Sequence, residues 1–163
     1  NACPCGSLGA PDGVCQCSDE EVRCYWKRLG GALLDRIDIR VGVAPEAVRT
    51  MVGPCGERSA VVRERVSAAA DIQRRRFARE GFHWNAEIPP GRIQRYCAID
   101  DETSEKLVSA ARQMNLSSRA CHSVLKVART IADLAGSERL RKADVMEALQ
   151  HRRHGRESPF WGG

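Results

Sequence analysis

The sequence predicts a mainly α-helical chain that carries one strand without partners. Apolar side chains recur at helical spacing through its second half, as at Val124, Ala128 and Ile131. Only residues 37–43 alternate between apolar and polar side chains as a strand does. A lone strand cannot pair its backbone, since even an isolated hairpin is marginally stable in water. We therefore expect this chain to be the C-terminal piece of a larger protein that supplies the missing strands.

The composition is that of a folded, soluble protein. The chain has 163 residues, a formal net charge of +5, 42% hydrophobic residues and 29% charged residues, which argues against wholesale disorder. No apolar run is long enough to span a bilayer, so we expect no membrane partner. Arginine supplies most of the positive charge and is clustered, which permits a nucleic acid or a nucleotide phosphate as partner.

Four segments are expected along the chain. Residues 1–57 combine a cysteine-rich loop with the strand. Residues 58–90 form a long basic helix and a linker, and residues 91–154 form a bundle of four helices. Residues 155–163 are expected to be a flexible tail.

Single residues predict the ends of the third helix of the bundle. Ser117 or Ser118 is placed to cap its start, because a serine oxygen accepts hydrogen bonds from the first free backbone amides. Gly136 follows its last apolar residue and is expected to end it. Within this helix, Arg129 and Asp133 are four residues apart, which predicts a pair inside the helix and no chemistry.

The long helix, which Ser59 is placed to cap, is rich in arginine. Most arginine-rich helix faces are simply solvated. Direct contact with DNA is the alternative, and salt-sensitive binding without sequence preference would be its signature. The arginines concerned are Arg63, Arg65, Arg74, Arg75, Arg76 and Arg79.

Four cysteines cluster near the start of the chain, at Cys3, Cys5, Cys15 and Cys17. They form two C-x-C pairs separated by nine residues that include glycine and proline. Zinc binds four thiolates in a tetrahedron, so this cluster predicts a structural zinc site with every ligand position filled by protein. Four free thiols or a local disulfide pair are the alternatives. The remaining cysteines are scattered singly, which indicates a reducing, cytoplasmic setting.

Two arginines are candidates for contact with phosphate. Arg36 lies between Asp35 and Asp38, directly before the strand, and either pairs with these acids or projects toward a phosphate as an arginine finger does. Arg119 falls in the first turn of the third bundle helix, where the helix dipole prefers an acid. Its guanidinium suits phosphate oxygens, and an exposed arginine near a helix cap is the plainer interpretation.

Several motifs together resemble one family. They are Cys-Pro-Cys-Gly, Cys-x-Cys-Ser, Arg-Leu-Gly-Gly-Ala-Leu-Leu-Asp-Arg-Ile-Asp, Leu-Ser-Ser-Arg-Ala-Cys-His and Val-Ala-Arg-Thr-Ile-Ala-Asp-Leu-Ala-Gly-Ser-Glu. On these residues the chain resembles the C-terminal part of the bacterial magnesium-chelatase-like AAA+ ATPases of the competence protein M type. The resemblance runs from Cys3 to about Arg153 and implies one core strand, a long basic helix and a helical lid.

The resemblance also implies roles and partners. Arg36 corresponds to the arginine finger that reaches the ATP of an adjacent subunit, and Arg119 to the sensor 2 arginine on the γ-phosphate. The family implies a cytoplasmic homohexamer that uses ATP and Mg²⁺, and its competence-type members act on DNA as branch-migration motors. No G-x-x-x-x-G-K-[ST] motif occurs here, so we expect no hydrolysis by this chain alone.

Two alternatives stay open at this point. One is a zinc-stapled helical module that binds nucleic acid or protein without ATPase activity. The other is an ATPase subunit of a magnesium chelatase, which acts on a porphyrin together with partner subunits.

Overall fold

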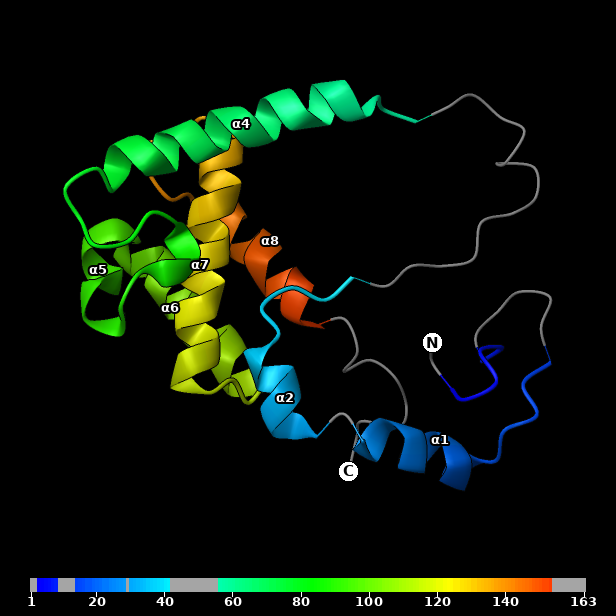
Figure 1. Ribbon diagram of the computed structural model, residues 1–163. Coiled ribbons are helices and arrows are strands. Elements are labelled where there is room, and N and C mark those ends of the chain that lie inside the picture. The colour runs from blue at the N-terminus through cyan, green and yellow to red at the C-terminus, as the bar shows by residue number, and fades with distance from the viewer. Residues whose placement is uncertain (1–2, 9–13, 29, 42–55, 154–163) are drawn as a thin grey trace.

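The computed structural model describes residues 3–8, 14–28, 30–41 and 56–153, and these residues are mainly helical. Figure 1 shows α4 lying across one end of α7, with the other bundle helices beside α7 and the cysteine-rich loop at the opposite side of the molecule. The helices are α1 (Asp19–Lys27), α2 (Gly31–Arg36), α4 (Ser59–Arg76), η1 (Asn85–Glu87), η2 (Pro90–Arg92), α5 (Ile93–Tyr96), α6 (Asp101–Gln113), α7 (Ser118–Leu134) and α8 (Lys142–Arg153).

The expected strand has no partner among the described residues. Residues 37–41 form no β-ladder, and residues 42 and 43 lie outside the described part, as do residues 155–163. The backbone at Ile37 is extended, with φ −85° and ψ 112°, so the segment has a strand-like shape at its start without the pairing.

The short helix α2 was not expected. The sequence interpretation placed Arg36 at the entrance of a strand, whereas the structure makes it the last residue of α2. The Asp35 carboxylate accepts a hydrogen bond from the Ser117 hydroxyl on α7, at 2.9 Å. A contact with so distant a residue is not encoded in local propensity, which is why the sequence pattern did not predict α2.

Helix α7 organises the bundle. One of its faces buries Val124 and Ala128 against Leu149 and Val145 of α8. Its start and end are as predicted: Ser117 is the N-cap, and its hydroxyl accepts from the Ala120 amide at 3.1 Å.

The end of α7 is a Schellman turn at Gly136. This glycine has φ +65°, a left-handed conformation that glycine adopts without strain. The Ser137 amide donates to the Ala132 carbonyl at 2.8 Å and the Gly136 amide to the Asp133 carbonyl at 3.1 Å. The prediction that Gly136 ends the helix is confirmed.

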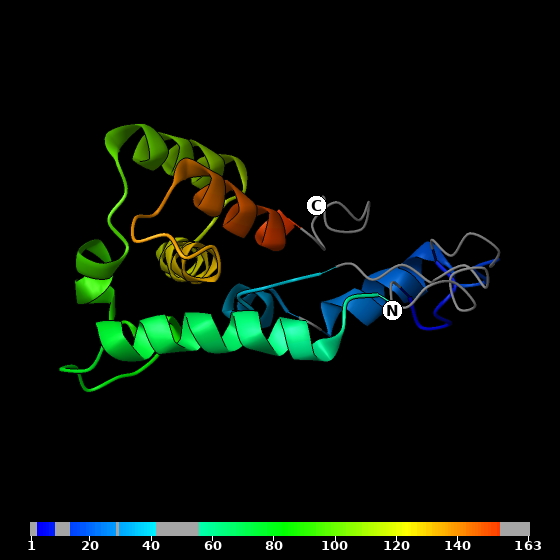
Figure 2. The same ribbon diagram turned by 90° about the horizontal axis from the view of Figure 1, so that it is seen from above.

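Helix α4 is covered by the bundle along only part of its length. Ala69, Gln73 and Phe77 are buried near its C-terminal end, whereas Val62 and Val66 on the same face are 38% and 55% exposed. Figure 2 looks along α7 and shows the N-terminal half of α4 projecting past it. The expected cap is wrong by one residue, because Arg58 is the N-cap position and no side chain caps the helix there.

A buried charge network joins α4 to α7. Asp133 is 2% exposed, and its carboxylate accepts from Arg129 Nε at 3.2 Å and from Arg76 Nη1 at 2.8 Å. The Asn85 side-chain amide of η1 donates to the same carboxylate at 2.8 Å. The predicted pair of Arg129 and Asp133 is therefore confirmed, and it is part of a larger network that ties three elements together.

Removal of the Asp133 carboxylate should be strongly destabilising. Asp133→Ala leaves the guanidinium groups of Arg76 and Arg129 without their counter-charge, and the expected loss is about 3–5 kcal/mol of unfolding free energy. Urea denaturation measures it. The matched control is Asp71→Ala, which breaks the exposed 2.8 Å ion pair between Asp71 and Arg74 within α4. This loss should cost no more than about 1 kcal/mol. Equal losses of unfolding free energy in the two variants would contradict the stabilising role of the buried Asp133 network.

Candidate functional site

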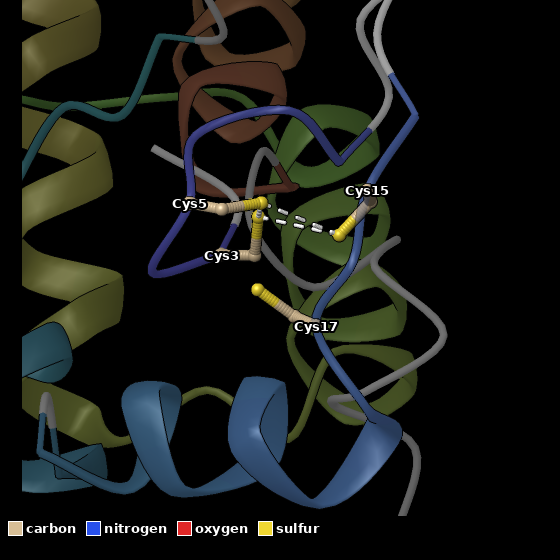
Figure 3. Close-up of side chains that lie close together, drawn as sticks. All are labelled: Cys3, Cys5, Cys15 and Cys17. Atoms are coloured by element: carbon tan, nitrogen blue, oxygen red, sulfur yellow. Dashed lines mark hydrogen bonds between the residues drawn. The ribbon is translucent and has the colours of Figure 1, made fainter.

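The four clustered cysteines converge on one point. Their sulfur atoms all lie within 4.8 Å of one another, and Figure 3 shows the four side chains directed toward a common centre. The Sγ atom of Cys3 lies 3.3 Å from that of Cys5 and 3.6 Å from that of Cys15. A tetrahedral zinc ion with Zn–S bonds of about 2.3 Å holds its sulfurs about 3.8 Å apart. The four side chains could therefore hold zinc, and all four are free thiols rather than disulfides.

Backbone geometry brings these thiols together. Gly6 has φ +82°, which favours glycine, and its amide closes a turn by donating to the Cys3 carbonyl at 3.1 Å. On the other side, Ser18 follows Cys17 and caps α1 through a capping box with Glu21. The Ser18 amide donates to the Glu21 carboxylate at 2.8 Å, which fixes the chain directly after the second cysteine pair.

The electrostatics of the cluster favour a cation. The Ser7 backbone amide, followed by the Cys3 and Cys17 thiols, lowers the pKa of Cys5 to about 6. The Cys5 backbone amide favours the Cys17 thiolate, but the Cys5 thiol, burial and the other two thiols together raise the pKa of Cys17 to about 12. Negative charge on one sulfur thus opposes ionisation of its neighbours. A bound Zn²⁺ would remove this repulsion, because it stabilises all four thiolates.

Arg36 is left exposed because its neighbouring acids bind elsewhere. Asp35 accepts from the Ser117 hydroxyl, and Asp38 accepts from Arg152 Nη2 at 3.3 Å and from the Ser123 hydroxyl. No hydrogen bond or ion pair joins the Arg36 guanidinium to another side chain in the part of the chain that the structure describes. Pairing with Asp35 and Asp38, the plainer interpretation of the sequence, is therefore not what the structure has.

Arg119 lies at the edge of a basic cavity. It is exposed in the first turn of α7, and the cavity beside it has a volume of about 470 Å³. Arg119, His122 and Lys126 follow one another at i, i+3 and i+7, which places them on one face of the helix. The cavity is lined by Asp38, Ala86, Pro90, Arg119, His122, Ser123 and Lys126.

The sequence analysis missed His122, Lys126 and Asp38 as cavity residues. The spacing of the two basic residues from Arg119 was a usable signal, because helical period places all three on one face. Asp38 could not be found in this way, since only the fold brings residues 37–41 to α7. The cavity lining thus combines one acidic residue, Asp38, with the basic residues Arg119 and Lys126 of α7.

The two candidate arginines lie on elements that contact each other. The hydrogen bond between Asp35 and Ser117 joins the residue before Arg36 to the N-cap of the helix that carries Arg119. The cysteine cluster stands apart from this pair in the sequence and in Figure 1. The part of the chain that the structure describes therefore holds two candidate sites, a cluster of four cysteines and a pair of exposed arginines.

Residues 56–152, more than half of the chain, match the family described as "Magnesium chelatase, subunit ChlI C-terminal". The chain belongs to this family. Residues 1–51 match the companion family "Magnesium chelatase, subunit ChlI". The described part of the chain is mainly helical, as expected for the C-terminal, lid-containing part of a magnesium-chelatase-like AAA+ protein.

Curated relatives cover most of this chain. It is 36% identical to "Competence protein ComM" of Haemophilus influenzae over 137 residues, or 83% of the chain. It is 33% identical to "Uncharacterized protein YifB" of Salmonella typhimurium over 84% of the chain, and 32% identical to "Uncharacterized protein Rv2897c" of Mycobacterium tuberculosis over 95%. The matched parts amount to 26%, 27% and 30% of those proteins, so the chain corresponds to under a third of each relative.

Among the described residues, no helix has both the length and the apolar character needed to cross a membrane.

The cysteine cluster should carry zinc. Protein purified without chelator is expected to contain about one zinc ion per chain, because four converging thiolates form a closed tetrahedral site. Cys5→Ser should lower the zinc content measured by atomic absorption. Cys24→Ser, which changes an exposed cysteine outside the cluster, is the matched control and should leave it unchanged. A zinc content below about half an equivalent in the unsubstituted protein would rule out the site.

Proposed function

We propose that this chain is part of an ATP-hydrolysing AAA+ motor that acts on DNA, and that it supplies two arginines to ATP sites between subunits. Arg36 is the arginine finger that reaches the ATP of a neighbouring subunit, and Arg119 is the sensor 2 residue of its own subunit. One observation carries the proposal. Both acids beside Arg36 are bound to α7 and α8, so the guanidinium stays exposed at a helix end.

The chemistry is phosphoryl transfer from ATP to water. Negative charge on the γ-phosphate oxygens has to be stabilised as the bond to the leaving ADP breaks, and fixed guanidinium groups do this without reorganisation. Arg36 and Arg119 approach that phosphate from two subunits in a cytoplasmic homohexamer. The remainder of the parent protein binds ATP and Mg²⁺, since the sequence of this chain contains no Walker A motif.

The cavity beside Arg119 supports its assignment. Arg119, His122 and Lys126 present basic groups along one helix face, and a cavity of about 470 Å³ has room for a phosphate group. Lys126 Nζ also donates to the Ala86 carbonyl at 2.9 Å, which holds the linker against α7. Arg119 and Lys126 place two positive charges along this face, and His122 adds a ring nitrogen that can donate a hydrogen bond to an anion. A bound anion would therefore stabilise this end of the lid.

The zinc site is structural in this proposal. All four ligand positions are filled by Cys3, Cys5, Cys15 and Cys17, which leaves no position for water or substrate. Bound zinc would hold residues 3–8 and residues 14–17 together and fix the start of α1. Its role is to stabilise the fold, and no step of ATP hydrolysis passes through it.

DNA as the substrate is supported by the relative named as a competence protein and by helix α4. Arg63, Arg75 and Arg79 are exposed and have no acidic partner among the described residues. Arg74 lies over the ring of Trp84, with its guanidinium carbon 5.5 Å from the ring centroid. The family name favours a second candidate, a magnesium-chelatase subunit, and that function would not require DNA contact by α4.

Loss of the Arg36 guanidinium should slow ATP hydrolysis sharply and leave ATP binding unchanged. In the full-length protein, Arg36→Ala is expected to bind ATP normally and to hydrolyse it on the order of 10³-fold more slowly. Steady-state phosphate release and equilibrium nucleotide binding measure the two quantities. Arg139→Ala removes an exposed arginine from the loop after α7 and serves as the control. Normal hydrolysis by Arg36→Ala would refute the finger assignment.

Contact between α4 and the DNA backbone should appear in the salt dependence of binding. Replacing both Arg63 and Arg75 of α4 by Gln is expected to reduce the slope of log K against log salt by about two, one for each lost phosphate contact. Replacing both Arg112, on α6, and Arg139, in the loop after α7, by Gln is a charge-matched control, because both residues are exposed and lie outside α4. An unchanged slope in the α4 variant would place the DNA site elsewhere and favour the chelatase alternative.

A further inference from the structure

The segment that carries Arg36 is attached to the lid by polar contacts at both ends. At the start, Ser117 of α7 donates to the Asp35 carboxylate at 2.9 Å. Further along, the Arg40 amide donates to the His151 carbonyl of α8 at 2.9 Å, and Arg40 Nη2 donates back to the Leu34 carbonyl at 2.8 Å. Residues 34–40, here called the finger segment, are therefore held against α7 and α8 rather than extending freely.

Arg152 is the centre of this attachment. Its side chain is 1% exposed, and its Nη1 donates to the Asp35 carbonyl at 3.1 Å while its Nη2 donates to Asp38 at 3.3 Å. A buried guanidinium is stable only where its charge is matched. Asp38 supplies the negative charge and also accepts from the Ser123 hydroxyl of α7. One acid thus joins the finger segment to both α7 and α8.

The two faces of the finger segment differ in what they contact. Asp38 and Arg40 bind the lid through the hydrogen bonds described above, whereas the alternating residues Ile37 and Ile39 are 38% and 52% exposed. The polar face is the one that makes hydrogen bonds to α7 and α8. The finger segment is therefore attached to the lid whether or not another part of the protein covers Ile37 and Ile39.

We infer that Asp38 and Arg152 are positioning residues that lock the finger segment to the lid, so that Arg36 and Arg119 move as one rigid unit. This inference rests on the proposed function of the two arginines. Arg36 lies two residues before Asp38, and Arg119 lies four residues before Ser123 on α7. A movement of the lid when Arg119 engages a phosphate is therefore transmitted to Arg36. Each subunit couples its own ATP site to the finger that it offers its neighbour.

The test uses the full-length protein with two variants of the lock. Asp38→Asn keeps the shape and removes the charge, and Arg152→Lys keeps the charge but cannot reach both Asp35 and Asp38. Hydrogen exchange of the Arg40 amide reports attachment directly, because that amide donates to His151. Phosphate release and nucleotide binding report function. Glu102→Gln is the matched control, since it breaks the exposed ion pair with Lys142 that joins α6 to α8.

Loss of one hydrogen bond to a charged group should speed exchange at Arg40 by about tenfold or more. We expect kcat to fall by a similar factor while the ATP dissociation constant changes less than about twofold, because a displaced finger affects the transition state and not binding. Glu102→Gln should match the unsubstituted protein in every measurement. Should Asp38→Asn fail to fold, Ser123→Ala removes only one donor to Asp38 and gives the same comparison.

The outcomes separate this inference from the proposed function. Unchanged exchange at Arg40 in both lock variants would show that Asp38 and Arg152 do not hold the segment. Faster exchange with unchanged kcat would overturn the positioning role, provided that Arg36→Ala is inactive. Normal turnover by Arg36→Ala would remove the functional basis, whereas faster exchange at Arg40 would still establish the attachment.

Discussion

A buried charge must meet an opposite charge, and this constraint decides how the parts of the chain are joined. Asp133 is buried in α7 and is matched by Arg76 of α4 and Arg129 of α7, which fixes the long helix to the lid. Arg152 is buried in α8 and is matched by Asp38, which fixes the finger segment to the same lid. A buried charge that loses its partner costs several kcal/mol of free energy. The contacts of Asp133 and of Arg152 are therefore both costly to break while these charges stay buried.

Both joints meet on α7, and the two faces of this helix have different tasks. The apolar face packs Val124 and Ala128 into the core with α8. The polar face carries Ser117 and Ser123, which bind the acids around Arg36, and it carries Arg119 beside the basic cavity. Arg36 and Arg119 are therefore presented by a single rigid support. Under the proposed function, this support joins two ATP sites, because Arg36 serves the ATP of the neighbouring subunit while Arg119 serves the ATP of its own.

Local patterns in the sequence predicted what local physics determines. The cap at Ser117, the end at Gly136 and the pair of Arg129 with Asp133 each depend on residues within one or two helical turns. Cysteine spacing likewise predicted a cluster that the structure brings together. Contacts between distant segments could not be read in this way. Arg76 reaching Asp133, α2 docking on α7 and Arg152 meeting Asp38 all arise from packing, and no spacing rule signals them.

The central claim is that the two arginines serve one ATP from different subunits, and mixed hexamers test it most directly. Full-length Arg36→Ala and Arg119→Ala proteins, each inactive alone, would be assembled together and assayed for ATP hydrolysis. In a random mixture about one site in four combines an intact finger with an intact sensor, because each half is intact in half of the subunits. We predict that hydrolysis reappears in the mixture. If the mixture stays as inactive as its components while mixed hexamers form, the two arginines do not act across the subunit interface.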